Sequence, residues 1–204
     1  MTVDRFHTVI GIDPGSETSG LVVCRIDEAL GDRVSVVMHA NKAATLKEIR
    51  QTINRYAVEF RCARVLVAIE RVAPGQSSWT LTRTSELYGR VCEMVHALDP
   101  GMDAERRGLF VGMTRRDVLR NLRVVGRGAE RDKLVRHRLI GMHGADRSEA
   151  VGSRKAPGPL HGVSSHAWAA LAVAIAARIK HREVREMALA KYGLPDTALS
   201  WGET

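Results

Sequence analysis

Two acidic side chains stand at the ends of short apolar runs, where they could bind a divalent cation. Asp13 ends the run 8–13 just before a Pro-Gly turn, and Glu70 ends the run 65–70. Apolar, β-branched runs bounded by turn residues predict buried strands. Burying an ionised carboxylate is costly unless it is paired or coordinates a metal. Asp13 alone is equally well explained as the cap of its turn, but two acid-ended strands favour a cation site.

A histidine near the start of a third apolar element adds a nitrogen donor. His166 begins the stretch 164–181, in which nearly every residue after Trp168 is Ala, Leu, Val or Ile. A helix that is apolar all round has to be buried, here against a sheet. Imidazole is both a metal ligand and a proton shuttle, although a buried structural histidine is the alternative. The predicted catalytic and metal-binding residues are Asp13, Glu70 and His166.

Five strands and several helices are expected to position these groups. The predicted strands are 8–13, 21–26, 33–39, 65–70 and 108–112, and the predicted helices are 43–62, 79–98, 130–140, 164–181 and 183–192, together with one starting at Arg115. Short polar connections make the first three strands an antiparallel meander. The helix that follows returns the chain parallel to the first strand, which would place Asp13 beside Glu70. Thr114 and Asp117 resemble a capping box at the start of the helix beginning at Arg115.

Basic residues indicate an anionic partner. The formal net charge is +8, and arginines crowd residues 114–138. The planar arginine fork suits bidentate phosphate contacts, although a merely solvated basic face is the alternative. The glycines that flank Arg127 would permit close backbone approach to a phosphate. The predicted phosphate-binding residues are Arg115, Arg116, Arg120, Arg123, Arg127, Arg131 and Lys133, with Arg154 and Lys155 from a glycine- and proline-rich segment at 141–162 that is expected to be a mobile loop.

The overall composition indicates a globular protein. With 204 residues, 45% of them hydrophobic, the chain can bury a sizeable core. No apolar run is long enough to span a membrane and no signal peptide is recognisable, so we expect a cytoplasmic location without membrane association. The cysteines at 24, 62 and 92 lack metal-ligand spacing and are expected to be buried free thiols.

Four motifs, in this order and spacing, resemble those of RuvC-type Holliday-junction resolvases. Ile10-Gly11-Ile12-Asp13-Pro14-Gly15-Ser16 is similar to the first motif, and Ala68-Ile69-Glu70 with the polar loop and long helix after it is similar to the second. Residues 124–133 resemble the basic, glycine-containing connection of that family. His166 and the apolar helix after it match the last motif. The resemblance covers most of residues 8–180.

This resemblance implies an α/β protein of the RNase H-like fold. The fold has a five-stranded mixed sheet of order 3-2-1-4-5 with helices on both faces, here formed by residues 1–182 and followed by a C-terminal helix and tail at 183–204. The implied protein is a homodimer that binds a four-way DNA junction and cuts two opposing strands with two Mg²⁺ or Mn²⁺ ions per site. Helix 79–98 is the candidate dimer interface. Gln76, Ser77 and Trp79 become candidates for reaching into the junction, although Trp79 alone is better explained as a core residue.

One departure from the family leaves the activity open. Family members usually carry an acid one helical turn after His166, where this chain has Ala169. His166 can complete the site, Asp146 or Glu149 can reach in from the loop, or Ala169 is an inactivating change. The alternatives are therefore a catalytically inactive branched-DNA-binding protein and an RNase H-like nuclease with another branched substrate. An ATP-binding protein of the actin and sugar-kinase kind would need a second domain. The departures from the cellular pattern favour a phage or prophage protein.

Overall fold

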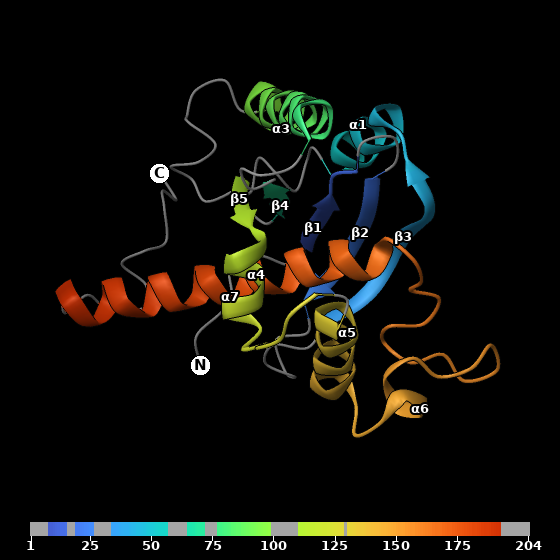
Figure 1. The fold of residues 1–204 in the computed structure, drawn as a ribbon. Helices are drawn as coiled ribbons and strands as arrows, with labels where there is room; N and C mark the ends of the chain where they lie inside the picture. The colour runs from blue at the N-terminus through green and yellow to red at the C-terminus, as the bar shows by residue number, and fades with distance from the viewer. Residues whose placement is uncertain are drawn as a thin grey trace.

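The computed structural model describes residues 8–15, 19–26, 34–56, 65–71, 77–98, 110–128 and 130–192. Their main feature is a five-stranded mixed sheet of order β3-β2-β1-β4-β5 (Figure 1). The strands are β1 (Thr8–Asp13), β2 (Ser19–Ile26), β3 (Val34–Ala44), β4 (Val65–Arg71) and β5 (Phe110–Thr114). Strands β1, β2 and β3 pair antiparallel, whereas β4 is parallel to both β1 and β5. The predicted sheet order and strand directions are confirmed.

Helices cover both faces of this sheet. They are α1 (Leu46–Arg55), α3 (Ser78–Leu98), α4 (Arg115–Asn121), α5 (Glu130–His143), α6 (Arg147–Ala150) and α7 (Ala167–Tyr192). Helix α7 lies across one face and contacts β1, β2 and β4, while α1 and α3 pack on each other and contact β3 and β4 respectively (Figure 1). In the described part of the chain, no helix is both long and apolar enough to cross a membrane.

Strand β1 and helix α7 approach each other closely because small residues face one another. A β-carbon on Gly11 would lie 2.2 Å from the carbonyl oxygen of Ala170 and 2.8 Å from the β-carbon of Ala174. Since side chains alternate along a strand, Asp13 lies on the same face as Gly11. Ile10 and Ile12 point to the opposite face and are completely buried. The first carboxylate is therefore presented to the side of the sheet that α7 covers.

The segment expected to be a mobile loop has more structure than predicted. Helix α5 extends to His143, α6 follows, and the Val36 amide donates to the carbonyl of Pro159 at 2.9 Å. His143 is buried, and its Nε2 accepts a hydrogen bond from the Val34 amide at 3.1 Å. These contacts use amides at the outer edge of β3. They therefore hinder this edge strand from pairing with a strand of another chain.

Other boundaries differ modestly from the prediction. Strand β5 continues to Thr114, two residues beyond the expected end, and α1 occupies residues 46–55 of the expected 43–62. Helix α7 runs unbroken from Ala167 to Tyr192, so the two helices expected at 164–181 and 183–192 are one. Its apolar stretch and its charged stretch are successive parts of this helix.

Candidate functional site

The predicted cation-binding residues line one pocket at the carboxyl ends of β1 and β4. The pocket has a volume of about 320 Å³. Its lining comes from the sheet, from α4 and α5 and from the start of α7: Asp13, Glu70, Arg115, Asp132, Val135, Ser165, His166, Trp168 and Ala169. Sequence analysis named Asp13, Glu70, His166 and Arg115 among these residues, and the fold brings all four together.

Strand register explains why the two strand-end acids meet. Ile12 is paired with Ile69 in the parallel β1–β4 ladder, and Asp13 and Glu70 are the next residues on the two strands. Adjacent parallel strands end at the same edge of a sheet. Both carboxylates therefore face the region beneath the start of α7.

Burial raises the pKa of both acids. The pKa of Asp13 rises to about 6, chiefly through desolvation, with Arg115 and His166 opposing the rise and Asp132 adding to it. The pKa of Glu70 rises to about 7, again chiefly through desolvation and then through repulsion from Asp13. A nearby positive charge would favour the ionised form of both groups.

Arg115 supplies part of that positive charge. Its Nη1 lies 3.5 Å from Oε2 of Glu70, while its Nη2 contacts Oδ1 of Asp132. The guanidinium therefore bridges a carboxylate on β4 and another on α5. This residue, predicted as a phosphate contact, is a counter-ion for both carboxylates in the structure.

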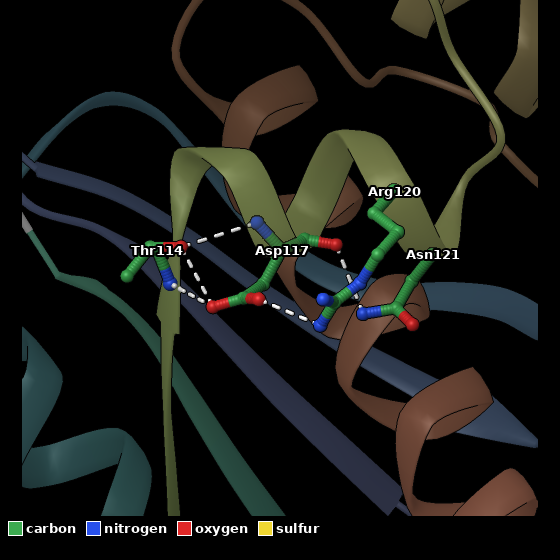
Figure 2. Close-up of polar contacts among 4 residues, drawn as sticks. All are labelled: Thr114, Asp117, Arg120 and Asn121. Atoms are coloured by element: carbon green, nitrogen blue, oxygen red, sulfur yellow. Dashed lines mark hydrogen bonds and ion pairs between the residues drawn. The ribbon is translucent and has the colours of Figure 1, made fainter.

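The position of Arg115 follows from the cap of α4, which Figure 2 shows. Oγ1 of Thr114 donates to Oδ2 of Asp117 at 2.6 Å and accepts from the Asp117 amide at 3.1 Å, completing the predicted capping box. The Thr114 hydroxyl and, at 3.2 Å, the Thr114 amide both donate to the Asp117 carboxylate, and these two hydrogen bonds lower its pKa. Arg120 and Asn121 add contacts to Asp117 at 2.8 and 2.9 Å. The cap fixes where β5 turns into α4, and Arg115 is the first residue after that turn.

His166 lies immediately before α7 rather than in its first turn. Its carbonyl oxygen accepts hydrogen bonds from the amides of Ala169 and Ala170, both at 3.2 Å. The preceding Ser165 has a φ of 47°, the left-handed region that a residue with a side chain seldom adopts. This turn leaves His166 exposed at the pocket while Ala167 and Trp168 are buried.

The chemistry of these donors fits a hard divalent cation. Carboxylate oxygens are the ligands that Mg²⁺ and Mn²⁺ prefer, and imidazole is an accepted additional ligand. Among the described residues, no three His, Cys, Asp or Glu side chains already stand close enough together to hold a metal. The carboxylates converge on the pocket with the Arg115 guanidinium between Glu70 and Asp132. A cation there would replace this guanidinium as their counter-charge.

Two acids considered for the site lie elsewhere. Asp146 caps α6 by accepting from the Glu149 amide at 2.9 Å, and Glu149 accepts from the Ala145 amide at 2.6 Å. Neither residue lines the pocket, whereas Ala169 does. The α7 wall of the pocket therefore carries a methyl group where a carboxylate could stand.

Several predicted phosphate contacts surround a second depression next to the first. It has a volume of about 450 Å³ and is lined by Arg115, Arg116, Leu119, Arg120, Val124 and Arg131. Arg115 belongs to both hollows. Other candidates are exposed and line neither hollow: Arg123, Arg127, Lys133, Arg154 and Lys155. The arginines of the second depression therefore border the pocket that holds Asp13 and Glu70, with Arg115 lining both.

Trp79 is an exposed aromatic residue rather than part of the core. Its exposed fraction is 61%, and the Arg83 guanidinium lies 4.6 Å from its ring centre. Ser77, just before α3, shares a hydrogen bond of 2.9 Å with Thr80. Gln76 lies outside the described residues. The core assignment of Trp79 was wrong because α3 buries a different stripe, which includes Val91 and Val95.

Two of the three cysteines, Cys24 and Cys92, lie within the described residues. Cys24 is completely buried, and burial raises its thiol pKa to about 12. Cys92 is half-buried and forms no disulfide bond with another described residue, and Cys62 lies outside the described residues.

Asp132 is the pocket residue that sequence analysis missed. Asp132 lies within the arginine-rich residues 114–138, which sequence analysis interprets only as a phosphate-binding stretch. A signal was nevertheless present, because Asp132 stands three and seven residues before Val135 and Leu139, which are buried. Residues three and seven apart share one helix face. That spacing puts Asp132 on the side of α5 that borders the pocket.

Comparison with solved structures identifies the fold. A structure described as "T. thermophilus RuvC in complex with Holliday junction substrate" superposes with a TM-score of 0.55 and 20% sequence identity, covering 87% of this chain and 96% of the other. Another, "Thermus thermophilus RuvC structure", gives 0.50 and 19% over the same shares. No protein-family model and no curated protein sequence matches. The chain therefore has the RNase H-like fold seen in these RuvC structures.

Proposed function

We propose that this chain is a divalent-cation-dependent endonuclease that binds four-way DNA junctions as a homodimer and cuts two opposing strands. The observation that carries the proposal is the convergence of Asp13, Glu70 and His166 on one pocket whose rim holds arginines. The shared fold with a RuvC bound to a junction supports the substrate class. Buried acids beside a basic surface fit a reaction on a phosphodiester better than simple DNA binding.

Each residue of the site has a role that its position supports. A bound Mg²⁺ or Mn²⁺ would neutralise charge on the scissile phosphate and make a bound water more acidic. Asp13 and Glu70 would hold the cations on the sheet side. His166, exposed at the pocket, would accept a proton from the attacking water. The arginines of α4 and α5 would hold the phosphates on either side of the cut.

The dimer is required by the reaction. Two symmetric cuts need two sites related by a two-fold axis. Of the apolar side chains on α3, Val91 and Val95 are already buried within the protomer, whereas Leu87, Met94 and Leu98 are only partly covered. These three side chains are the candidates for the interface.

Cleavage of a synthetic four-way junction tests the proposal. Paired nicks are expected with Mg²⁺ or Mn²⁺ on the junction but not on linear duplex of the same sequence. The Asp13→Asn variant should lose the nicks and keep junction binding. Binding without nicks by the unmodified chain would contradict the nuclease assignment.

An inactive junction-binding protein is the second candidate, because Ala169 lines the pocket without a donor atom. An Ala169→Asp variant separates the two. If the unmodified chain binds junctions without cutting and the variant cuts, the chain is an inactivated nuclease. An RNase H-like nuclease for another substrate would cut flaps or forks in preference to four-way junctions.

A further inference from the structure

We propose that Asp132 of α5 is a third carboxylate ligand of the cation site, reaching it from the part of the pocket wall that α5 forms. This inference rests on the proposed function only in assuming that the pocket takes a divalent cation. Residues Asp132, Asp13 and Glu70 line the same hollow. Asp132 lies in the first turn of α5, which begins at Glu130.

The contact made by Arg115 shows that Asp132 shares one counter-ion with Glu70. The same guanidinium touches Oε2 of Glu70 and Oδ1 of Asp132 through different nitrogens. Both carboxylates therefore present an oxygen to the space that this guanidinium occupies, and carboxylate oxygens are the ligands that Mg²⁺ and Mn²⁺ prefer. Arg115 marks the place that the cation takes.

Electrostatic coupling points the same way. Asp132 contributes to the raised pKa of both Asp13 and Glu70. Its side chain is 74% exposed, whereas that of Glu70 is only 14% exposed. An exposed carboxylate beside two buried ones is suited to attract a cation into the pocket and to hold its outer side.

The part of the pocket wall that α7 forms explains why such a ligand is needed. Ala169 supplies no donor, and Asp146 and Glu149 are engaged at α6. Within the described residues, Asp132 is the carboxylate other than Asp13 and Glu70 that lines this pocket. The site therefore gathers its acids from β1, β4 and α5.

Packing holds Asp132 toward the pocket. Val135, one turn further along α5, is buried and lines the same hollow. The guanidinium of Arg136 lies 4.8 Å from the ring centre of Trp168, which links α5 to the first turn of α7. These contacts fix the helix that carries Asp132 against the element that follows His166.

Titration of the DNA-free protein with Mn²⁺ at pH 8 in a calorimeter tests the assignment without any cleavage readout. Asp132→Asn is expected to weaken Mn²⁺ binding at least tenfold. The matched control is Glu130→Gln, which removes an exposed acid from the same helix that does not line the pocket, and it should leave the affinity within twofold. Equal effects of the two variants on Mn²⁺ affinity would overturn the proposal, because the loss of any negative charge on α5 would then weaken Mn²⁺ binding to the same extent.

A second pair of variants separates a ligand from a residue that only holds Arg115. In an Arg115→Met background, Asp132→Asn should still weaken Mn²⁺ binding at least tenfold. If the loss disappears in that background, Asp132 acts only through the arginine and the proposal is wrong.

Junction cleavage, measured separately, keeps the two proposals distinguishable. Cleavage by the unmodified chain with no Asp132→Asn effect on Mn²⁺ affinity overturns the ligand assignment and leaves the nuclease standing. A tenfold loss of Mn²⁺ affinity in Asp132→Asn supports the assignment even if the unmodified chain cuts no DNA.

Discussion

Gly20 of β2 lies against the backbone of His166, since a β-carbon on Gly20 would sit 2.3 Å from the His166 carbonyl oxygen. Gly20 is also the residue paired with Asp13 across the β1–β2 ladder. The missing side chain therefore lets the turn that carries His166 approach the end of β1. Two predicted site residues are brought together by a third residue that has no functional group.

Gly20→Ala should damage the site through this contact. The added methyl group would push away the carbonyl that starts α7, and overpacking of this kind costs about 1–3 kcal/mol. We expect lower stability in urea unfolding and a larger loss of cleavage than of junction binding. Gly89→Ala is the control, because a β-carbon there meets nothing within 4 Å. In a helix, that change should raise stability by up to about 1 kcal/mol, and a loss similar to that of Gly20→Ala would contradict this account.

The cation-free protein should lose stability as the pH rises from about 4 to about 7. The folded-state pKa values of Asp13 (about 6) and Glu70 (about 7) lie above their ordinary values. The folded state therefore binds more protons than the unfolded state in that range, and the free energy of unfolding falls with increasing pH. The slope is at most about 1.4 kcal/mol per pH unit for each carboxyl.

Urea unfolding in EDTA at a series of pH values measures this slope. Glu70→Gln should flatten it between pH 4.5 and 7, whereas the exposed Glu130→Gln should not. Added Mg²⁺ should restore stability to the unmodified protein at pH 7 but not at pH 4.5. A stability that rises with pH over this range would show that the acids are not buried as described.

Arg116→Ala should weaken junction binding in a salt-dependent way. Arg116 is exposed at the basic depression beside the acidic pocket. Losing one phosphate contact reduces the slope of log affinity against log salt by about 0.9. Binding titrations at several salt concentrations measure that slope. Arg50→Ala, an exposed arginine of α1, should leave it unchanged, and an equal effect of the two variants would indicate that only net charge matters.

Trp79→Ala should weaken junction binding if the exposed indole stacks on an unpaired base. Base–aromatic stacking is worth about 1–3 kcal/mol, so a loss of affinity of about 5- to 150-fold is expected. Trp79→Phe keeps a ring and should retain most of the affinity. Competition with linear duplex reports whether the contribution is specific to the junction. Full affinity in Trp79→Ala would exclude this contact.

The parts of the fold that sequence analysis predicted depend on local rules. The Thr114–Asp117 cap follows from side chains three residues apart, and the acid-ended strands follow from runs of apolar residues. Sheet order followed from the meander and one parallel return, together with the family resemblance. The meeting of Asp13 and Glu70 needed only the rule that adjacent parallel strands end at one edge.

What sequence analysis missed depends on long-range packing. Asp132 lines the pocket only because α5 packs beside the carboxyl ends of β1 and β4. In the sequence, Asp132 stands among arginines, which hides its role. The order in residues 144–163 comes from contacts such as Val36 with Pro159, which lie far apart in the chain. Trp79 is the second residue of α3, but tertiary packing decides which side of that helix is buried.

The close approach of Gly11 to Ala170 and Ala174 also sets the order of events when the chain folds. The face of β1 that carries Asp13 is covered by residues about 160 positions later in sequence. Until α7 has left the ribosome, that face stays open to solvent and His166 is absent. A growing chain therefore contains Asp13 and Glu70 well before it can form the pocket that they line together with His166.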